Sequence, residues 1–248
     1  MIILSILFFI TAILYSSIGF GGGSTYLALL LIWEIPYYIF PAIALICNII
    51  VVSGNCINYS KTGNFNLKLV APYLLGSVPF AFIGGSLSIE KKIFELLLFL
   101  ILLIAGILLL IQNKSFTKKN ITIKTPSLFI SLFIGSIIGF ASGIVGIGGG
   151  IFLSPILFLL KAAQPKQIAT TASFFILINS ISGVLGQLTK DNVLNQISGY
   201  WILFLAVLIG GQIGNYINLK IFSNRTLALA TACLVIFVAI RMGTRLMT

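Results

Sequence analysis

Two glycine-rich segments hold the residues whose types and spacing best suit binding chemistry. The first reads Gly19-Phe-Gly-Gly-Gly and runs directly into Ser24 and Thr25, and the second reads Gly146-Ile-Gly-Gly-Gly, with Ser154 close behind. Glycine lets the backbone turn sharply and lets other groups approach it. A helix that begins at such a turn exposes unpaired N–H groups and the positive end of its dipole. The pattern therefore predicts an anion site made of main-chain amides and assisted by hydroxyl groups.

Polar side chains inside two apolar stretches are the next candidates. Residues 37–59 contain Asn48 and Asn55, and residues 165–188 contain Thr171 and Asn179. Any one of these alone is better explained by a hydrogen bond between helices. As two stripes beside the glycine segments, they would line a path, because polar side chains in membrane helices usually face the interior of the bundle.

The predicted substrate-binding residues thus come from the two glycine segments and the two polar stripes: Gly19, Gly21, Gly22, Gly23, Ser24, Thr25, Gly146, Gly148, Gly149, Gly150, Ser154, Asn48, Asn55, Thr171 and Asn179. The alternative for the glycines is close packing of helices, which is common in membranes. Two clusters at matching positions favour the binding site over packing.

The composition places these segments in a membrane. The chain is 59% hydrophobic and only 8% charged, whereas soluble proteins carry about 25% charged residues. Its apolar runs are continuous rather than alternating, which favours helices over a membrane barrel. The net charge of +11 comes from basic residues in short gaps between the apolar runs. That distribution indicates orientation in the bilayer rather than nucleic-acid binding, with attraction of an anion as a secondary effect.

The predicted fold is an all-α polytopic membrane protein made of two four-block repeats. The first transmembrane repeat is 1–112, a polar linker follows at 113–125, and the second repeat is 126–248. The glycine segments are 127 residues apart, while Pro36 and Pro165 are 129 apart, as are Ser53-Gly54 and Ser182-Gly183. The eight apolar blocks are 2–33, 37–59, 67–88, 93–112, 126–160, 165–188, 197–218 and 226–246.

Blocks 2–33 and 126–160 are too long for one span of about 20 residues. Each is predicted to form a helix, a glycine turn near mid-bilayer and a short second helix. If both blocks return to the side where they began, the two repeats are inverted. In this inverted arrangement ten of the fifteen basic residues lie on one side of the membrane. If every block crosses once, nine of them lie on one side. The positive-inside rule therefore favours the inverted arrangement by one residue, with the linker in the cytoplasm.

The residue types needed for catalysis or metal binding are scarce. There is no histidine, no Cys-x-x-Cys pair, and only four acidic residues, all in or beside the polar gaps. No carboxylate or histidine is placed in the middle of an apolar block, where it could act as a proton relay, and no nucleophile–base pair stands out. The sequence predicts no enzyme activity, no cofactor and no metal site.

The glycine pattern, present once per half of an eight-block membrane chain, resembles the TauE/SafE family. The second cluster is followed by Pro155, as it is in that family, whereas Ala28 stands where the first cluster would have its proline. The resemblance implies a multi-pass carrier in the inner membrane of a bacterium or archaeon. It also implies a small sulfur oxyanion or an organosulfonate, such as sulfite, as the substrate.

The sequence therefore predicts a secondary carrier or facilitator whose partners are a small inorganic or organic anion and the lipid bilayer, without nucleic acid. The anion would be bound near mid-membrane between the two glycine turns. The alternative is a non-transporting scaffold or accessory subunit. The exact substrate, the direction of transport, any coupling ion, the oligomeric state and the choice between carrier and channel are left open by the sequence.

Overall fold

The computed structural model describes residues 1–17, 19–61, 63, 65–112 and 126–217, together with the single positions 233, 236 and 240. Within these ranges the chain is all-helical, as predicted, and contains no strand. The predicted linker 113–125 lies outside the described residues. So does the predicted block 226–246, apart from the three single positions.

The helices follow the predicted blocks closely. Four segments are long and apolar enough to cross a membrane by length and composition: Tyr37–Lys61, Leu67–Ser86, Leu128–Val145 and Lys166–Gln187. The helices in chain order are α1 (Ile2–Ser16), α2 (Gly23–Ile32), the short 3-10 helix η1 (Tyr37–Ile39), α3 (Phe40–Lys61), α4 (Leu67–Ser86), α5 (Lys91–Gln112), α6 (Leu128–Val145), α7 (Gly150–Leu159), α8 (Pro165–Gln187), α9 (Val193–Ser198) and α10 (Trp201–Ile217).

Both long blocks are interrupted at their glycine segments. Block 2–33 divides into α1 and α2, and block 126–160 divides into α6 and α7. The two short helices have ten residues each. Each is followed, one residue after its C-cap, by a residue with left-handed backbone, Glu34 at φ 53° and Lys161 at φ 52°. The same local structure therefore occurs twice, 127 residues apart.

Block 197–218 differs from its prediction at its start. The structure places a short helix, α9, ahead of α10, with a left-handed turn at Asn192 (φ 62°) and a break at Gly199 and Tyr200. The α9 sequence VLNQIS is too polar to register as an apolar run. Its helix is anchored by the buried side chains of Val193 and Ile197 instead.

Glycines let two pairs of helices touch backbone to backbone. A Cβ built on Gly139 of α6 would overlap the backbone of Ser77 in α4, and one built on Gly143 would overlap that of Ala81. In the same way, glycines of α10 pack against the backbone of α1. Such contacts are the usual basis of helix association in membranes. The residue numbers rise together in both pairs, so α4 runs parallel to α6 and α1 runs parallel to α10.

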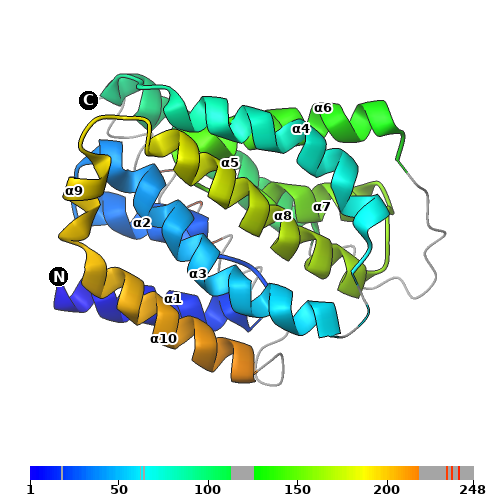
Figure 1. Cartoon of the computed structure of the whole chain (residues 1–248), viewed down its shortest axis with the longest axis horizontal. Coiled ribbons are helices and arrows are strands. Elements are labelled where there is room, and N and C mark those ends of the chain that lie inside the picture. The colour runs from blue at the N-terminus through cyan, green and yellow to red at the C-terminus, as the bar shows by residue number, and fades with distance from the viewer. Residues whose placement is uncertain are drawn as a thin grey trace.

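The directions of these helices show where each interrupted block begins and ends. Helix α10 starts at the end of the bundle that holds α9, so its parallel neighbour α1 also starts there (Figure 1). Helix α2 returns to that end, because η1, which follows it, contacts α9 and α5. In the second interrupted block, α6 begins at the opposite end of the bundle and α7 ends there. Helices α4 and α8 also start at that end (Figure 1). Each block therefore returns to the end from which it set out.

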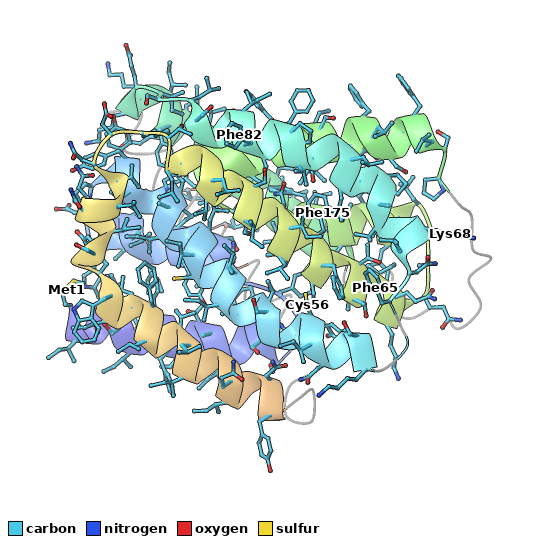
Figure 2. All side chains as sticks on the ribbon, viewed as in Figure 1. Met1, Cys56, Phe65, Lys68, Phe82 and Phe175 are labelled. Carbon is cyan, nitrogen blue, oxygen red and sulfur yellow. The ribbon has the colours of Figure 1, made fainter. Side chains whose placement is uncertain are left out.

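Charge is divided unevenly between the two ends. The four acidic residues Glu34, Glu90, Glu95 and Asp191 lie in or beside the turns of the α9 end. The opposite end carries the basic residues at the adjoining ends of α3, α4, α7 and α8, and Figure 2 shows one of them, Lys68, far from Met1. Because cytoplasmic loops are enriched in lysine and arginine, this opposite end is the expected cytoplasmic face.

The arrangement predicts which positions share a side of the membrane. In a Cys233→Ser background, where Cys47 and Cys56 are buried, cysteines placed at Lys61 and Lys161 should react with an impermeant thiol reagent from the same side. A cysteine at Glu34 should react from the other side. If each block crossed once, Glu34 and Lys161 would label together and Lys61 separately, which would contradict the observed directions.

Candidate anion site between the glycine segments

The two glycine segments lie against each other inside the bundle. A Cβ built on Gly23 would lie 2.5 Å from the carbonyl oxygen of Ile147 and 2.7 Å from Asn48 Nδ2. A Cβ built on Gly148 would lie 2.5 Å from the same Asn48 nitrogen. No side chain fits at either position without displacing its neighbours. The absence of side chains therefore lets the two breaks meet, with Asn48 of α3 between them.

Each break ends at the N-terminus of a short helix. Gly22 (φ 88°) is the N-cap of α2 and Gly149 (φ 80°) is the N-cap of α7, and neither cap is satisfied by a side chain. The left-handed backbone at both caps favours glycine. The first N–H groups of each helix have no acceptor within the helix, and the dipole places about half a positive charge there.

Asn48 is fully buried, and neither its Nδ2 nor its Oδ1 has a hydrogen-bond partner among the described residues. A buried polar group left unsatisfied costs about 1–3 kcal/mol. The amide lies beside Gly21, Gly23 and Gly148, so it reaches both segments. The site therefore presents a donor and an acceptor that the protein itself does not satisfy.

Helix α8 adds two more fully buried polar side chains on the side of the second segment. Asn179 Nδ2 donates a long hydrogen bond of 3.4 Å to the carbonyl oxygen of Gly148, and Asn179 Oδ1 has no partner. Ser180 Oγ lies 3.2 Å from a Cβ built on Gly148 and is also without a partner in the described structure. The aromatic ring of Phe175, labelled in Figure 2, closes the region beside Gly149.

Other predicted residues help to hold the two turns. The Gly19 carbonyl oxygen accepts a short hydrogen bond from Ser173 Oγ, and Gly146 packs on the backbone of Pro41. Thr25 Oγ1 is hydrogen-bonded to Tyr15 OH at 2.7 Å. Buried residues in the first two turns of α2 and α7 complete this group: Ser24, Gly150 and Ser154.

Two predicted residues are not brought against the glycine segments. Asn55 lies about two turns beyond Asn48 on α3, and its Oδ1 accepts a 3.5 Å hydrogen bond from Ser16 Oγ. Thr171 is buried on α8, two turns before Asn179, and is not among the nearest contacts of any of these glycines. Both remain predicted residues of the site without direct geometric support.

The predicted set of site residues leaves out Ser173, which belongs to the predicted polar stripe of block 165–188, and it leaves out Ser180 and Tyr59. The hydroxyl of Tyr59 lies against Gly19. Ser173, Ile176 and Ser180 are spaced by three and four residues, so they lie on one face of α8. This face is the one that meets Gly148 and Gly150. The seven-residue spacing of the two serines, which puts them two turns apart on one face of α8, is the pattern that points to them.

Contact between the segments predicts a cost for adding one methyl group. Gly23→Ala should lower the unfolding temperature in detergent, by an amount equivalent to about 1–3 kcal/mol, because the new Cβ meets a backbone carbonyl. Gly199→Ala is the control, since a Cβ there has one neighbour at 3.9 Å, and it should change stability by less than about 0.5 kcal/mol. Equal stability of the two variants would mean that the segments do not touch as described.

Comparison with known proteins identifies the family. A family model for the sulfite exporter TauE/SafE matches residues 4–242. A probable membrane transporter protein of Sinorhizobium fredii is 30% identical over 221 residues, covering 89% of each chain. A probable membrane transporter protein of Bacillus subtilis is 26% identical, covering 88% of this chain and 89% of the relative. A probable membrane transporter protein of Methanocaldococcus jannaschii is 29% identical, covering 88% of this chain and 86% of the relative. No solved structure matches the chain. The chain belongs to the sulfite exporter TauE/SafE family of membrane transporters.

Proposed function

We propose that this protein is a secondary carrier or facilitator for a small anion, bound near mid-membrane between the two glycine breaks. A sulfur oxyanion or an organosulfonate, such as sulfite, is the expected substrate. The observation that carries the proposal is the buried amide of Asn48, which has no partner in the described structure and lies between the N-termini of two helices.

The donors around the breaks suit an oxyanion, whose oxygen atoms are acceptors. Asn48 Nδ2, the hydroxyl of Ser180 and the first-turn amides of α2 and α7 would each donate a hydrogen bond. A protonated form such as hydrogen sulfite would also donate to Asn48 Oδ1 or Asn179 Oδ1. The four side-chain atoms named here, from Asn48, Asn179 and Ser180, are among the buried polar atoms that lack partners in the described structure.

The side chains nearest to the glycine segments are neutral. Two helix dipoles and a few neutral donors bind an anion more weakly than a buried lysine would. Conduction requires binding that is strong enough to admit the ion and weak enough to release it. A neutral site therefore suits transport better than permanent retention of the anion.

We further propose that the two halves, 1–112 and 126–248, are inverted repeats joined by the linker 113–125. Support comes from the parallel pair α1 and α10, which has its counterpart in the parallel pair α6 and α4. It also comes from α2 and α7, which return to opposite ends of the bundle. In transporters of this type, substrate binds at the interface between repeats, and rocking of one repeat against the other exposes it alternately to the two sides.

The basic end of the bundle would face the cytoplasm, with the protein in the inner membrane of a bacterium or archaeon. The S. fredii, B. subtilis and M. jannaschii relatives come from such organisms.

Transport in vesicles tests the proposal. Purified protein in liposomes should take up sulfite, thiosulfate or an organosulfonate faster than empty vesicles. Asn48→Leu and Gly149→Val should reduce uptake to the level of empty vesicles, because one removes the central donor and the other fills the break. Asn195→Leu, at an exposed position on α9, should transport normally. A wild-type protein that moves none of these anions would favour the scaffold or accessory-subunit alternative.

Stability measurements separate a binding role of Asn48 from a structural one. Replacing an unsatisfied buried amide by an apolar side chain of similar shape is neutral or stabilising. Asn48→Leu should therefore melt at the same or a higher temperature than the wild type in detergent. The transported anion should raise the melting temperature of the wild type only, because a ligand stabilises the state that binds it. A large loss of stability in Asn48→Leu would show that the amide serves the fold.

A further inference from the structure

A polar cavity opens at the α9 end of the bundle. It has a volume of about 400 Å³ and lies between η1, the α4–α5 connection, α9 and the start of α3. Its polar lining is provided by Tyr37, Tyr38, Ser88, Lys190, Asp191 and Gln196. We call it the Lys190 pocket.

The floor of the Lys190 pocket adjoins the second glycine segment. Pro41 and Ile144 line the pocket. The backbone of Pro41 is also what a Cβ on Gly146 would strike, and Ile144 precedes that glycine by two residues. The pocket and the second glycine segment therefore have Pro41 and Ile144 as common neighbours.

Lys190 is the only basic residue that lines the pocket. Its Nζ donates a 2.9 Å hydrogen bond to Gln187 Oε1, and the fully buried Gln187 donates from Nε2 to the carbonyl oxygen of Gly143 at 2.9 Å. The neighbouring Asp191 forms no ion pair with it, since the one ion pair within the described ranges joins Lys91 and Glu95. The ammonium group is thus held by a neutral amide, and its charge is left available to a ligand.

The size of the pocket indicates passage rather than tight binding. The pocket volume of about 400 Å³ exceeds the volume of a small oxyanion. Because one water molecule takes about 30 Å³ of liquid volume, the remaining space holds several waters, and the anion would keep much of its hydration shell there. A hydrated anion is attracted by the half-buried cation of Lys190, whereas the glycine segments have neutral donors. The Lys190 pocket would therefore attract the hydrated anion, and the donors at the glycine segments would replace its water.

We propose that the Lys190 pocket is the access pocket through which a small oxyanion reaches the glycine segments from the α9 side, with Lys190 as the cation that receives it. This inference rests on the proposed transport function.

The ionisation of Lys190 gives the proposal a pH dependence. Burial lowers the pKa of Lys190 to about 8, so the receiving charge is largely present at pH 7 and largely lost at pH 9. The other ionisable side chains that line the pocket are Tyr37, Tyr38 and Asp191. An arginine at position 190 would keep its charge throughout this range.

The test uses the full chain in phosphatidylcholine vesicles, so that anionic lipid headgroups do not compete, with sulfite and thiosulfate as the probes. Lys190→Gln should raise KM by about tenfold, the low end of the effect of a charged cleft on counter-ion concentration, with little change in kcat. Lys190→Arg should keep the wild-type KM at pH 7. Lys92→Gln removes an exposed lysine at the same end that does not line the pocket, and should have no effect.

Two further readouts distinguish a receiving charge from a structural role. Between pH 7 and pH 9 the KM of the wild type should rise relative to that of Lys190→Arg, and this ratio cancels any titration of the substrate. Lys190→Cys in the Cys233→Ser background should recover a low KM for methanesulfonate when aminoethyl methanethiosulfonate restores the ammonium group. Methanesulfonate is the probe in this experiment because sulfite would cleave the mixed disulfide. Modification with the sulfonatoethyl reagent, which adds a negative charge, should not restore it.

The outcomes separate this proposal from the transport function on which it rests. Wild-type vesicles that move no anion would overturn both. Normal wild-type transport with an unchanged KM in Lys190→Gln, or failure of the aminoethyl group to restore KM, would overturn the access role of Lys190 and leave the glycine site standing.

Discussion

The structure depends on one constraint, which is that main-chain groups freed by breaking a helix inside the lipid must be buried in protein or line a cavity. This protein breaks two helices and brings both breaks to the same place, with Gly23 against the carbonyl of Ile147 and Asn48 between them. The glycine contacts of α4 with α6 and of α1 with α10 hold the first helix of each broken block in position. The short helices α2 and α7 then direct their N-termini into the interior. Three fully buried side chains, Asn48, Asn179 and Ser180, keep polar atoms unsatisfied around this point at a cost in stability.

Much of this arrangement could be predicted from the sequence, because glycine has a distinct physical role wherever it interrupts an apolar run. The two breaks, the lengths of the short helices and the all-helical class follow from the glycine motifs and the block lengths. Asn48 and Asn179 could be identified as intramembrane amides. Their partnership with specific glycines could not, because the polar side chains of α3 and α8 are spread over more than one face of each helix. Lipid is as apolar as a protein core, so hydropathy does not show which face of α8 is turned inward, and Ser180 was missed for that reason. The short helix α9 was missed because its polar sequence gives no apolar run.

The distribution of charge complements the neutral centre. The basic end of the bundle has no acidic residue in the part of the chain that the structure describes, whereas the α9 end carries all four acidic residues together with Lys190. Under the proposed function, the cation of Lys190 would attract the anion where water is present, and the neutral donors at the glycine segments would bind it where water is removed. The chain of hydrogen bonds from Lys190 through Gln187 to Gly143 ties the Lys190 pocket to the helix that ends at the second break.

The most direct measurement is the position of a heavy oxyanion in the protein. Crystals of the full chain soaked with selenite, a heavier analogue of sulfite, should give an anomalous selenium peak between the two glycine segments. The peak should lie within hydrogen-bond reach of Asn48 Nδ2 and of the first-turn amides of α2 and α7. A transport-active protein whose selenium peak lies away from both segments, with Asn48 still unsatisfied, would contradict the claim that the paired breaks bind the transported anion.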